Sequence, residues 1–335
     1  MFYVCVRERQ PRIKFPNRLI AATLTHTALP PLIETENLTK KFGDATAVED
    51  LTLRVNDGEV FGFLGPNGAG KTTTVRMLTC LISKTSGSAH VDGLDVGKQS
   101  DAYHIRKIIG LLPESVGMYD DLSAYKNLNF YGKLYGCTES QREERIQRFL
   151  RLLGIWDKRD LAVGTFSKGM RQKVGIARAL IHDPKVVFLD EPTANLDPES
   201  SRTIREFILE LKRDKKTVFL NTHNLDEAQR VCDRVGILKG KLLAAGSIDD
   251  LRSSLWPMKT AIQLELVSEQ VVAAVNRLGP KSVQTAANEL VVEVADPIKE
   301  NPEIIKAIVG AGGRIRYVRD MSPTLEDVYL RLVRN

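Results

Sequence analysis

Short apolar runs alternate with amphipathic segments from residue 33 to about residue 247. The runs predict buried β-strands at residues 33–38, 51–55, 60–64, 109–112, 186–189 and 218–220. Residues 204–211 place apolar side chains at i, i+3, i+4 and i+7, which predicts an amphipathic helix. Residues 234–245 predict a hairpin that turns near Gly240. Strands that alternate with helices predict an α/β fold with a largely parallel sheet.

A helical block interrupts this alternation. Residues 123–160 are rich in Leu, Tyr, Lys and Arg and contain few strand signals. We therefore expect a helical subdomain, at about 115–165, inserted into the sheet domain.

The pattern changes after Ser254, and Pro257 marks a linker. Strands are predicted at 260–267, 290–294 and 314–318, with a weaker one at 282–284, and helices at 268–278, 297–309 and 324–333. Without the final helix this order is β-α-β-β-α-β, the order of ferredoxin-like folds. We therefore predict a small C-terminal α+β domain at 258–335, with the final helix packed on it.

The length of 335 residues agrees with one large and one small domain, because a single core usually stops growing at ~250–300 residues. Hydrophobic residues make up 43% and charged residues 27%, a balance that excludes disorder of the whole chain. The formal net charge of +6 suits anionic partners such as nucleotides, nucleic acid or a membrane face, and it selects none of them.

A glycine-rich turn follows the predicted strand at 60–64. It matches the pattern G-x-x-x-x-G-K-[ST] and consists of Gly65, Pro66, Asn67, Gly68, Ala69, Gly70, Lys71 and Thr72, with Thr73 next. Glycines allow successive backbone N–H groups to surround phosphate oxygens, and the helix that follows adds its positive N-terminal end. Lys71 can reach the outer phosphates, and Thr72 can offer its hydroxyl to Mg²⁺. The flanking strand and helix favour an ATP site over a chance glycine-rich turn.

Two acidic residues end the buried run at 186–189. Asp190 and Glu191 would lie at the carboxyl end of a strand, where α/β sheets bind their ligands. We expect Asp190 to help hold Mg²⁺ and Glu191 to orient the water that attacks ATP. An acidic turn after a core strand is the simpler alternative, and the nearby P-loop makes it the weaker one.

Two further features are ambiguous by themselves. Ser167 and Gly169 begin a predicted helix, where Ser167 would be an N-cap and the helix start could hold a second anion. His223 follows the strand at 218–220, so it would lie beside Asp190 if the two strands are neighbours. A histidine in this place can hydrogen-bond a terminal phosphate, whereas a lone histidine is more often a surface or core residue.

The order and spacing of these motifs resemble those of the nucleotide-binding subunits of ABC transporters, from Ile33 to the C-terminus. The resemblance identifies 65–72 as Walker A, 186–190 as Walker B, Ser167 and Gly169 as the signature loop, Asp197 as the D-loop aspartate and His223 as the switch histidine. It also identifies Glu191 as the catalytic glutamate and Phe42 as the aromatic residue that stacks on adenine. It implies a P-loop NTPase domain at 33–250, with a RecA-like core sheet, an antiparallel β part and the inserted helical subdomain.

Several positions depart from the usual pattern of this family. Glu114 stands where the family has the Q-loop glutamine, and Phe166, Lys168 and Met170 replace three of the five signature residues. Glu114 could still bind Mg²⁺ through a carboxylate oxygen, although it adds negative charge near ATP. These departures, and the ending at 322–329, resemble the branch that serves drug, antibiotic, sodium and polysaccharide exporters.

The resemblance implies a motor subunit. Two copies, or this chain and a similar ATPase, would face each other head to tail, with Ser167 and Gly169 of one covering ATP on Walker A of the other and Asp197 at the contact. Lys71, Glu191 and His223 would catalyse hydrolysis. The dimer would act on a polytopic membrane permease at the cytoplasmic face of the membrane, with no direct nucleic-acid contact. The alternative from another class is a soluble ABC-type ATPase that acts on a ribosome, DNA or a protein assembly, and the cargo cannot be read from the sequence.

The N-terminal segment and the cysteines bear on the compartment. We expect residues 1–32 to be a disordered basic arm, or the result of a start codon placed too early. A signal peptide, which 19–32 faintly resembles, is less favoured because an exported protein would lose access to ATP. The four cysteines form no CxxC pair, which favours reduced thiols. No run reaches the ~20 apolar residues that a membrane span needs.

Overall fold

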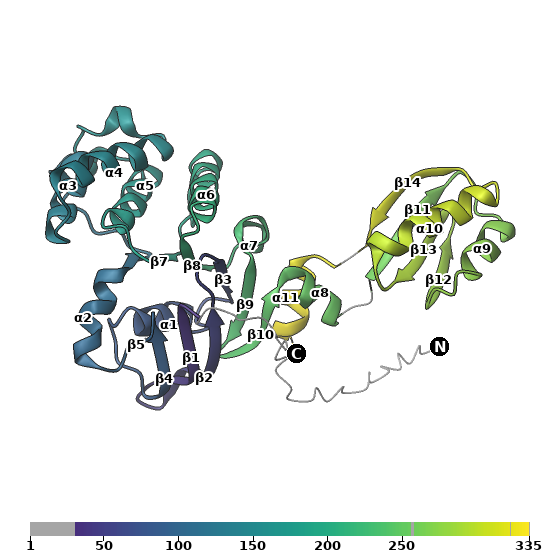
Figure 1. Ribbon diagram of the computed structural model, residues 1–335, viewed down its shortest axis with the longest axis horizontal. Coiled ribbons are helices and arrows are strands. Elements are labelled where there is room, and N and C mark those ends of the chain that lie inside the picture. The colour runs from purple at the N-terminus through teal and green to yellow at the C-terminus, as the bar shows by residue number, and fades with distance from the viewer. Residues whose placement is uncertain (1–30, 256–257, 322, 335) are drawn as a thin grey trace, which may run out of the picture. The chain divides into compact units, whose positions relative to one another are not determined.

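The computed structural model describes residues 31–255, 258–321 and 323–334 (Figure 1). The basic arm expected at residues 1–32 therefore lies outside the described residues, apart from Pro31 and Leu32. The expected linker residue Pro257 also lies outside them.

A six-stranded sheet, with the strand order β10-β9-β3-β8-β7-β6, forms the centre of the larger part of the chain. Its strands are β3 (Val60–Leu64), β6 (Ile109–Leu112), β7 (Val186–Asp190), β8 (Thr217–Thr222), β9 (Arg234–Lys239) and β10 (Lys241–Ser247). All neighbouring pairs are parallel except β9 and β10, which form the predicted hairpin. Every residue of β3, β7 and β8 is buried, as expected for strands covered on both faces. The predicted α/β fold with a largely parallel sheet is confirmed.

Successive side chains of the central strands enter two different hydrophobic clusters, because side chains alternate between the faces of a sheet. Phe61 and Phe63 of β3 belong to one cluster together with Val75, whereas Val60 and Leu64 belong to the other. The first cluster includes helix α1 (Lys71–Leu78), and the second includes α5 (Lys168–Leu180), α6 (Pro198–Arg213) and α7 (Leu225–Val231). Because β3, β8 and β7 are adjacent and parallel, the loops that follow them emerge at one edge of the sheet.

A separate antiparallel sheet, with the order β2-β1-β4-β5, provides the expected antiparallel β part. Its strands are β1 (Ile33–Phe42), β2 (Ala45–Val55), β4 (Ser86–Val91) and β5 (Leu94–Asp95), and helix α2 (Gln99–Ile108) follows them. The strands β4 and β5 and the helix α2 were not among the predicted elements. Only Ala89 and Val91 of β4 are buried, so the apolar signal of this strand is weak.

The helical block between β6 and β7 consists of α3 (Ala124–Leu134), α4 (Glu139–Leu152), the 3₁₀ helices η1 (Trp156–Lys158) and η2 (Val163–Thr165), and α5. Side-chain caps start its helices: the Ser123 hydroxyl caps α3, and Thr138 caps α4 within a capping box. Leu128, Ile146 and Leu150 are fully buried between these helices and the rest of the cluster. The predicted insertion of a helical subdomain into the sheet domain agrees with this order of elements.

The small C-terminal region has its own hydrophobic cluster and its own antiparallel sheet, with the order β12-β13-β11-β14. Its elements are β11 (Met258–Leu264), α9 (Glu269–Asn276), β12 (Ser282–Ala286), β13 (Glu289–Val294), α10 (Pro297–Gly310) and β14 (Ile315–Asp320). They follow one another in the predicted order β-α-β-β-α-β. The ferredoxin-like class and the domain limits at 33–250 and 258–335 stay predictions.

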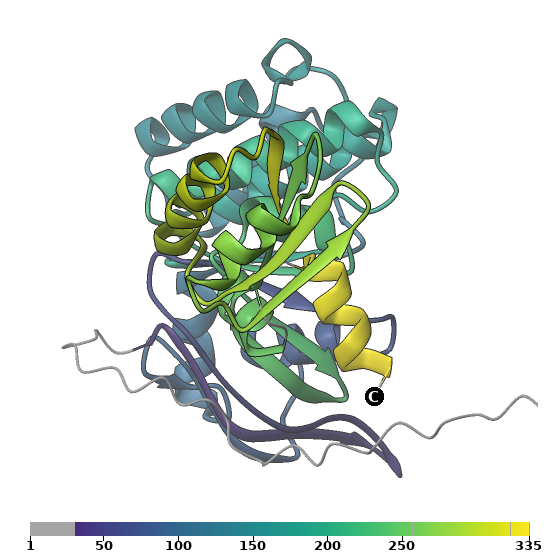
Figure 2. The ribbon, with the colours of Figure 1, turned by 90° about the vertical axis from the view of Figure 1, so that its right-hand side faces the viewer.

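The last helix, α11 (Leu325–Arg334), does not pack where the sequence analysis placed it. Leu325 and Val328 are fully buried in the cluster that also contains Val231 of α7 and Leu251 of helix α8 (Ile248–Leu255). Figure 2 shows α11, in yellow, beside the hairpin of β9 and β10, which it contacts. The prediction that this helix packs on the small domain is therefore wrong. Helical periodicity identifies an apolar face, but it does not identify the surface that covers this face.

Candidate functional site

The glycine-rich turn at 65–72 joins β3 to α1 at the edge where the loops emerge. Gly70 is the N-cap of α1 and has a φ of +98°. A Cβ atom at Gly65 would lie 2.4 Å from the carbonyl oxygen of Leu238, and one at Gly70 would lie 2.3 Å from that of Ala47. Both positions therefore require glycine, because the backbone of a neighbouring segment occupies the space of a side chain.

Lys71 is buried at the start of α1, with 6% of the residue exposed. Its Nζ donates to the carbonyl oxygens of Gly65 at 2.8 Å and Pro66 at 3.3 Å. Burial lowers the pKa of the Lys71 ammonium below its ordinary value. The carboxylates of Glu191, Asp190 and Glu114 oppose this change in the pKa, and Glu191 opposes it most.

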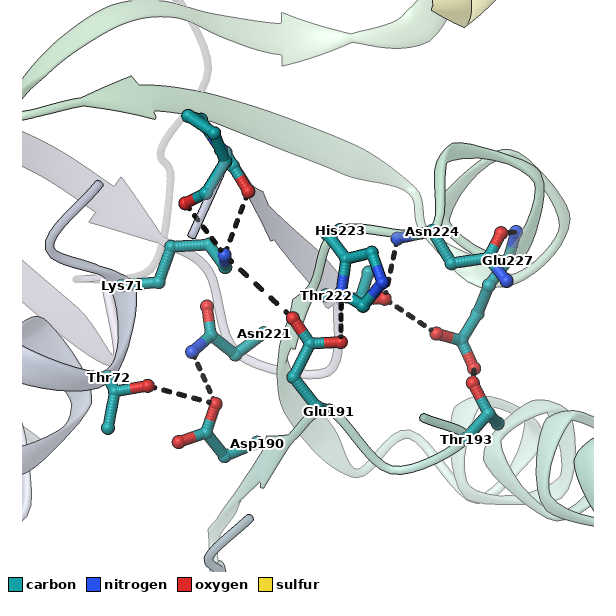
Figure 3. A network of polar contacts seen from close by, with 12 residues as sticks. Lys71, Thr72, Asp190, Glu191, Thr193, Asn221, Thr222, His223, Asn224 and Glu227 are labelled. Carbon is teal, nitrogen blue, oxygen red and sulfur yellow. Dashed lines mark hydrogen bonds and ion pairs between the residues drawn. The ribbon is translucent and has the colours of Figure 1, made fainter. Parts of the chain in front are cut away.

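Asp190 ends β7 and is 3% exposed. One of its carboxylate oxygens, Oδ1, lies 3.4 Å from the Thr72 hydroxyl and accepts a hydrogen bond of 2.6 Å from Asn221 Nδ2 (Figure 3). The tertiary structure thus joins the hydroxyl of the P-loop to the acid at the end of a different strand. Thr73, the next residue of α1, is half-buried.

Glu191 occupies a special backbone position directly after β7. Its φ is +50°, and its N–H donates to the carbonyl oxygen of Asn221 at 2.8 Å. Its carboxylate lies 3.8 Å from Lys71 Nζ and 2.8 Å from His223 Nδ1. The sequence analysis expected His223 beside Asp190 only if the strands that precede these two residues are neighbours. They are neighbours, because β7 and β8 pair with each other. Backbone strain of this kind is frequent at functional sites.

A second network, which the sequence analysis missed, lies on the side of Glu191 that faces away from Lys71 (Figure 3). Glu227 of α7 is 0% exposed, and its carboxylate accepts from the hydroxyls of Thr193 at 2.8 Å and Thr222 at 2.9 Å. Burial raises the pKa of Glu227, and the two hydroxyls oppose this rise. Thr193 follows Glu191 by two residues and Thr222 directly precedes His223, so Glu227 joins the two loops. A single glutamate inside a helix carries no spacing signal that could have revealed this role.

Two predicted nucleotide contacts lie at more exposed positions. Phe42 ends β1, and 53% of the residue is exposed, with Lys40 Nζ 4.8 Å from the centre of its ring. Glu114 follows β6 and is exposed, and its charge acts on the pKa of Lys71.

Ser167, Gly169 and Asp197 form a separate group at the starts of α5 and α6. The Ser167 hydroxyl caps α5 by accepting from the Met170 N–H at 3.3 Å, as predicted. Asp197 caps α6 by accepting from the Ser200 N–H at 2.7 Å, and this hydrogen bond lowers the pKa of its carboxyl. A Cβ atom at Gly169 would lie 2.4 Å from the Ser200 hydroxyl, so the two helix starts are in close contact. Ser167 is exposed, whereas Gly169 is buried.

The turn between β3 and α1 and the acidic end of β7 together define a P-loop nucleoside triphosphatase. Comparison with known proteins identifies its family. Residues 48–194 match the ABC transporter family, and residues 246–333 match the C-terminal domain of DrrA1-3-like ATP-binding proteins. The chain belongs to the ATP-binding subunits of ABC transporters, and it binds and hydrolyses ATP; its DrrA-like C-terminal domain fits the drug-exporter branch.

Three relatives illustrate the branch. The linearmycin resistance ATP-binding protein LnrL of Bacillus subtilis is 32% identical over 90% of this chain and 98% of its own length. The Nod factor export ATP-binding protein I of Cupriavidus metallidurans is 32% identical over 90% of this chain and 97% of its own length. The ABC transporter ATP-binding protein NatA of Bacillus subtilis is 43% identical over 62% of this chain and 85% of its own length. These relatives confirm the prediction of a transporter subunit over the ribosome, DNA or protein-assembly alternative.

Solved structures agree with the fold. An ATP-binding subunit of an ABC transporter matches with a TM-score of 0.62 and 31% identity, over 67% of this chain and 92% of that chain. A dimeric ATP-binding cassette in a post-hydrolysis state, bound to ADP and Pi, matches with a TM-score of 0.59 and 25% identity, over 64% of this chain and 98% of that chain. Among the described residues, no helix is long and apolar enough to cross a membrane.

Proposed function

We propose that this chain powers export through a membrane permease by binding Mg²⁺ and ATP between two ATPase subunits and hydrolysing the ATP at Glu191. The position of Glu191 carries the proposal. Its carboxylate lies between the P-loop lysine, at 3.8 Å, and His223, at 2.8 Å. An acid held in this way can polarise a water molecule beside a terminal phosphate.

The phosphates of ATP would bind to the backbone N–H groups of the turn at 65–73, which ends at the positive N-terminus of α1. Lys71 would exchange its carbonyl partners for the outer phosphate oxygens. The exposed ring of Phe42 would stack on adenine.

Thr72, Asp190 and Glu114 are the residues proposed to hold Mg²⁺. Hydroxyl and carboxylate oxygens are donors that Mg²⁺ prefers. Both hydrogen bonds described for the Asp190 carboxylate end on Oδ1, which leaves Oδ2 for the ion or for one of its waters. Bound Mg²⁺ would neutralise charge on the phosphate oxygens.

In the proposed reaction, Glu191 accepts a proton from water while the water oxygen bonds to the γ-phosphorus. The bond from the γ-phosphorus to the ADP oxygen breaks, and ADP and phosphate are the products. His223 contacts Glu191 through Nδ1, which leaves Nε2 for a hydrogen bond to a terminal phosphate oxygen. Lys71 stabilises negative charge on the transferred group.

A second ATPase subunit would complete the site. In the proposed head-to-tail dimer of two copies, or of this chain and a similar ATPase, Ser167 and Gly169 of one subunit cover the ATP of the other. Asp197 lies at the contact between the subunits. The exposed cap residue Ser167 and the dimeric cassette among the similar structures support this arrangement.

The permease would bind the dimer at the cytoplasmic face of the membrane. We propose that the helical block and the loop at 114–119 transmit the motion of the dimer to this partner. Tyr119 and Phe130 support this proposal, because they are 49% and 42% exposed and form an edge-to-face pair at 5.2 Å. Exposed aromatic residues of this kind are enriched at protein interfaces.

A glutamine at Glu191 tests the catalytic assignment. Glu191→Gln should still bind ATP, should lose turnover and should accumulate as an ATP-bound dimer in size-exclusion chromatography. Glu206→Gln is a matched control, because Glu206 lies on the exposed side of α6 and pairs only with Arg202 among the described residues. Turnover of Glu191→Gln at the unmodified rate would contradict the assignment.

Copurification tests the partner. The tagged chain, extracted with mild detergent from the membranes of its own cells, should retain a polytopic membrane protein in comparable amount. Recovery with ribosomes, DNA or assembly factors alone would contradict the permease proposal and would leave the ATP chemistry unaffected.

A further inference from the structure

Asn221 lies at the centre of the nucleotide site without a role in the proposed reaction. It belongs to β8, where its Cα partners are Phe63 of β3 and Asp190 of β7. Its side chain is 0% exposed, and its Nδ2 donates to Asp190 Oδ1 at 2.6 Å. Asn221 therefore fixes the orientation of the acid that is proposed to hold Mg²⁺.

The hydrogen bond to Asp190 also fixes the orientation of the amide. The opposite orientation would place the amide oxygen against a carboxylate oxygen, and two acceptors repel each other. The Oδ1 atom of Asn221 thus points away from Asp190, on the side of Lys71 (Figure 3). It is buried and has no hydrogen-bond partner among the described residues. A buried acceptor without a partner costs about 1–3 kcal/mol, so such an atom in a native protein calls for a water, an ion or a ligand.

A second buried asparagine, Asn127, differs from Asn221 in its hydrogen bonds. Asn127 of α3 is also 0% exposed, and its oxygen accepts from the Tyr119 N–H at 3.0 Å. Its amide nitrogen donates to the carbonyl oxygens of Tyr119, Leu122 and Ser123. The polar groups of Asn127 are paired within the fold, which suits a structural residue, whereas only the donor half of Asn221 is paired.

The chemistry of the free oxygen limits its partner. A carbonyl oxygen accepts hydrogen bonds, so it cannot pair with a bare phosphate oxygen, which is also an acceptor. The Nζ of Lys71 donates to Gly65 and Pro66 in this structure, and in the proposed complex with ATP it donates to the phosphate oxygens instead. A water molecule on Mg²⁺ is a strong donor, because the ion polarises its O–H bonds, and Mg²⁺ usually keeps several waters.

We propose that Asn221 is a positioning residue for Mg²⁺: its amide N–H holds the Asp190 carboxylate, and its carbonyl oxygen accepts from a water ligand of the ion. This inference rests on the proposed binding of Mg²⁺ at Thr72 and Asp190. Asn221 strengthens the binding of ATP with Mg²⁺ and has no effect on the binding of ATP alone.

Equilibrium binding of ATP, with saturating Mg²⁺ and with EDTA, tests this in a Glu191→Gln background that prevents turnover. The quantity measured is the gain in ATP affinity that Mg²⁺ produces. Asn221→Leu, which keeps a similar shape, should reduce this gain about tenfold and leave the affinity in EDTA unchanged. Asn221→Val, which suits a strand and has no polar group, provides a second variant with the same expected loss. Asn127→Leu is the control for the loss of a buried amide, and its Mg²⁺-dependent gain should remain complete.

Three results would overturn the inference. A full gain in both Asn221 variants would show that the residue does not act on the ion. An equal loss of affinity with and without Mg²⁺ would show that Asn221 acts on Lys71 or on the phosphates instead. If the Glu191→Gln parent itself shows no gain with Mg²⁺, the proposed Mg²⁺ site fails, and this result is distinguishable because it appears before Asn221 is changed.

Discussion

Replacement of Glu227 by alanine should loosen the two loops that carry Glu191 and His223, the proposed catalytic pair. The carboxylate of Glu227 is fully buried and accepts hydrogen bonds from Thr193 and Thr222. Thr193 belongs to the loop that begins at Glu191, and Thr222 directly precedes His223. Loss of the carboxylate removes the only link among the described hydrogen bonds that joins these two threonines.

The expected cost follows from the groups left unpaired. Each of the two buried hydroxyls that lose this acceptor costs about 1–3 kcal/mol, so Glu227→Ala should lower the free energy of unfolding by about 2–6 kcal/mol. A displacement of the Glu191–His223 pair by about 1 Å should lower kcat on the order of 10–100-fold. ATP affinity should change much less, because the P-loop lies outside this network.

The variant Glu227→Gln keeps the shape of the side chain but cannot carry its charge, so it tests the effect of the charge alone. Because burial raises the pKa of Glu227, there is a pH window between the unfolded and the folded pKa in which the folded protein keeps a proton that the unfolded chain has lost. The stability contributed by this group is complete below the unfolded pKa and is lost as the pH rises through the higher folded pKa. Glu227→Gln cannot ionise, so its stability relative to the unmodified protein should rise across this pH window, while its hydrogen bonds are largely kept.

Thermal unfolding between pH 4 and 8 and steady-state ATP hydrolysis check these expectations together. Glu227→Ala should unfold at lower temperature and turn over slowly, and Glu227→Gln should keep most of the turnover. The reasoning is refuted if Glu227→Ala hydrolyses ATP at the unmodified rate, because the two loops would then hold their geometry without the carboxylate.

Two further changes test the P-loop and the last helix. Gly70→Ala should abolish ATP binding measured by equilibrium dialysis, because the added Cβ would lie 2.3 Å from a carbonyl oxygen. The control is Gly136→Ala, which should bind ATP normally: Gly136 also has a positive φ, but a Cβ there would meet nothing within 4 Å. Leu325→Ala should destabilise the protein by about 2–5 kcal/mol in chemical unfolding, because this side chain is 0% exposed in the cluster shared with α7. The control is Leu266→Ala, which should have little effect on stability because Leu266 is 70% exposed. Normal ATP binding by Gly70→Ala or unchanged stability of Leu325→Ala would contradict these two readings of the structure.

The parts of the site that the sequence revealed are those with a strong local pattern. The turn at 65–72 carries its chemistry in consecutive residues, and the buried run at 186–189 points directly to Asp190 and Glu191. The strands β3 and β6 have the predicted limits because the Gly65-Pro66 turn follows the first apolar run and Pro113 follows the second.

Single polar residues that contact segments distant in the sequence could not be predicted from local patterns. Asn221 and Glu227 are single polar residues in a strand and a helix, and no spacing rule distinguishes them from structural ones. Their importance depends on the pairing of β7 with β8 and on the burial of α7. The same limitation explains the wrong placement of α11, whose apolar face was visible although its partner surface was not.

By itself, the sequence determined the class of chemistry, since phosphate binding needs a contiguous P-loop and hydrolysis needs an acid at a strand end. It also indicated most of the strands and helices with a clear apolar pattern, because local periodicity reports which side chains are buried, but it missed β4, β5 and α2. Only the tertiary structure decided which strands are neighbours, that His223 meets Glu191, that Asn221 holds Asp190, and where α11 packs. The physical reason is that hydrogen bonds between distant segments require long-range packing, and the local pattern of a chain carries no record of it.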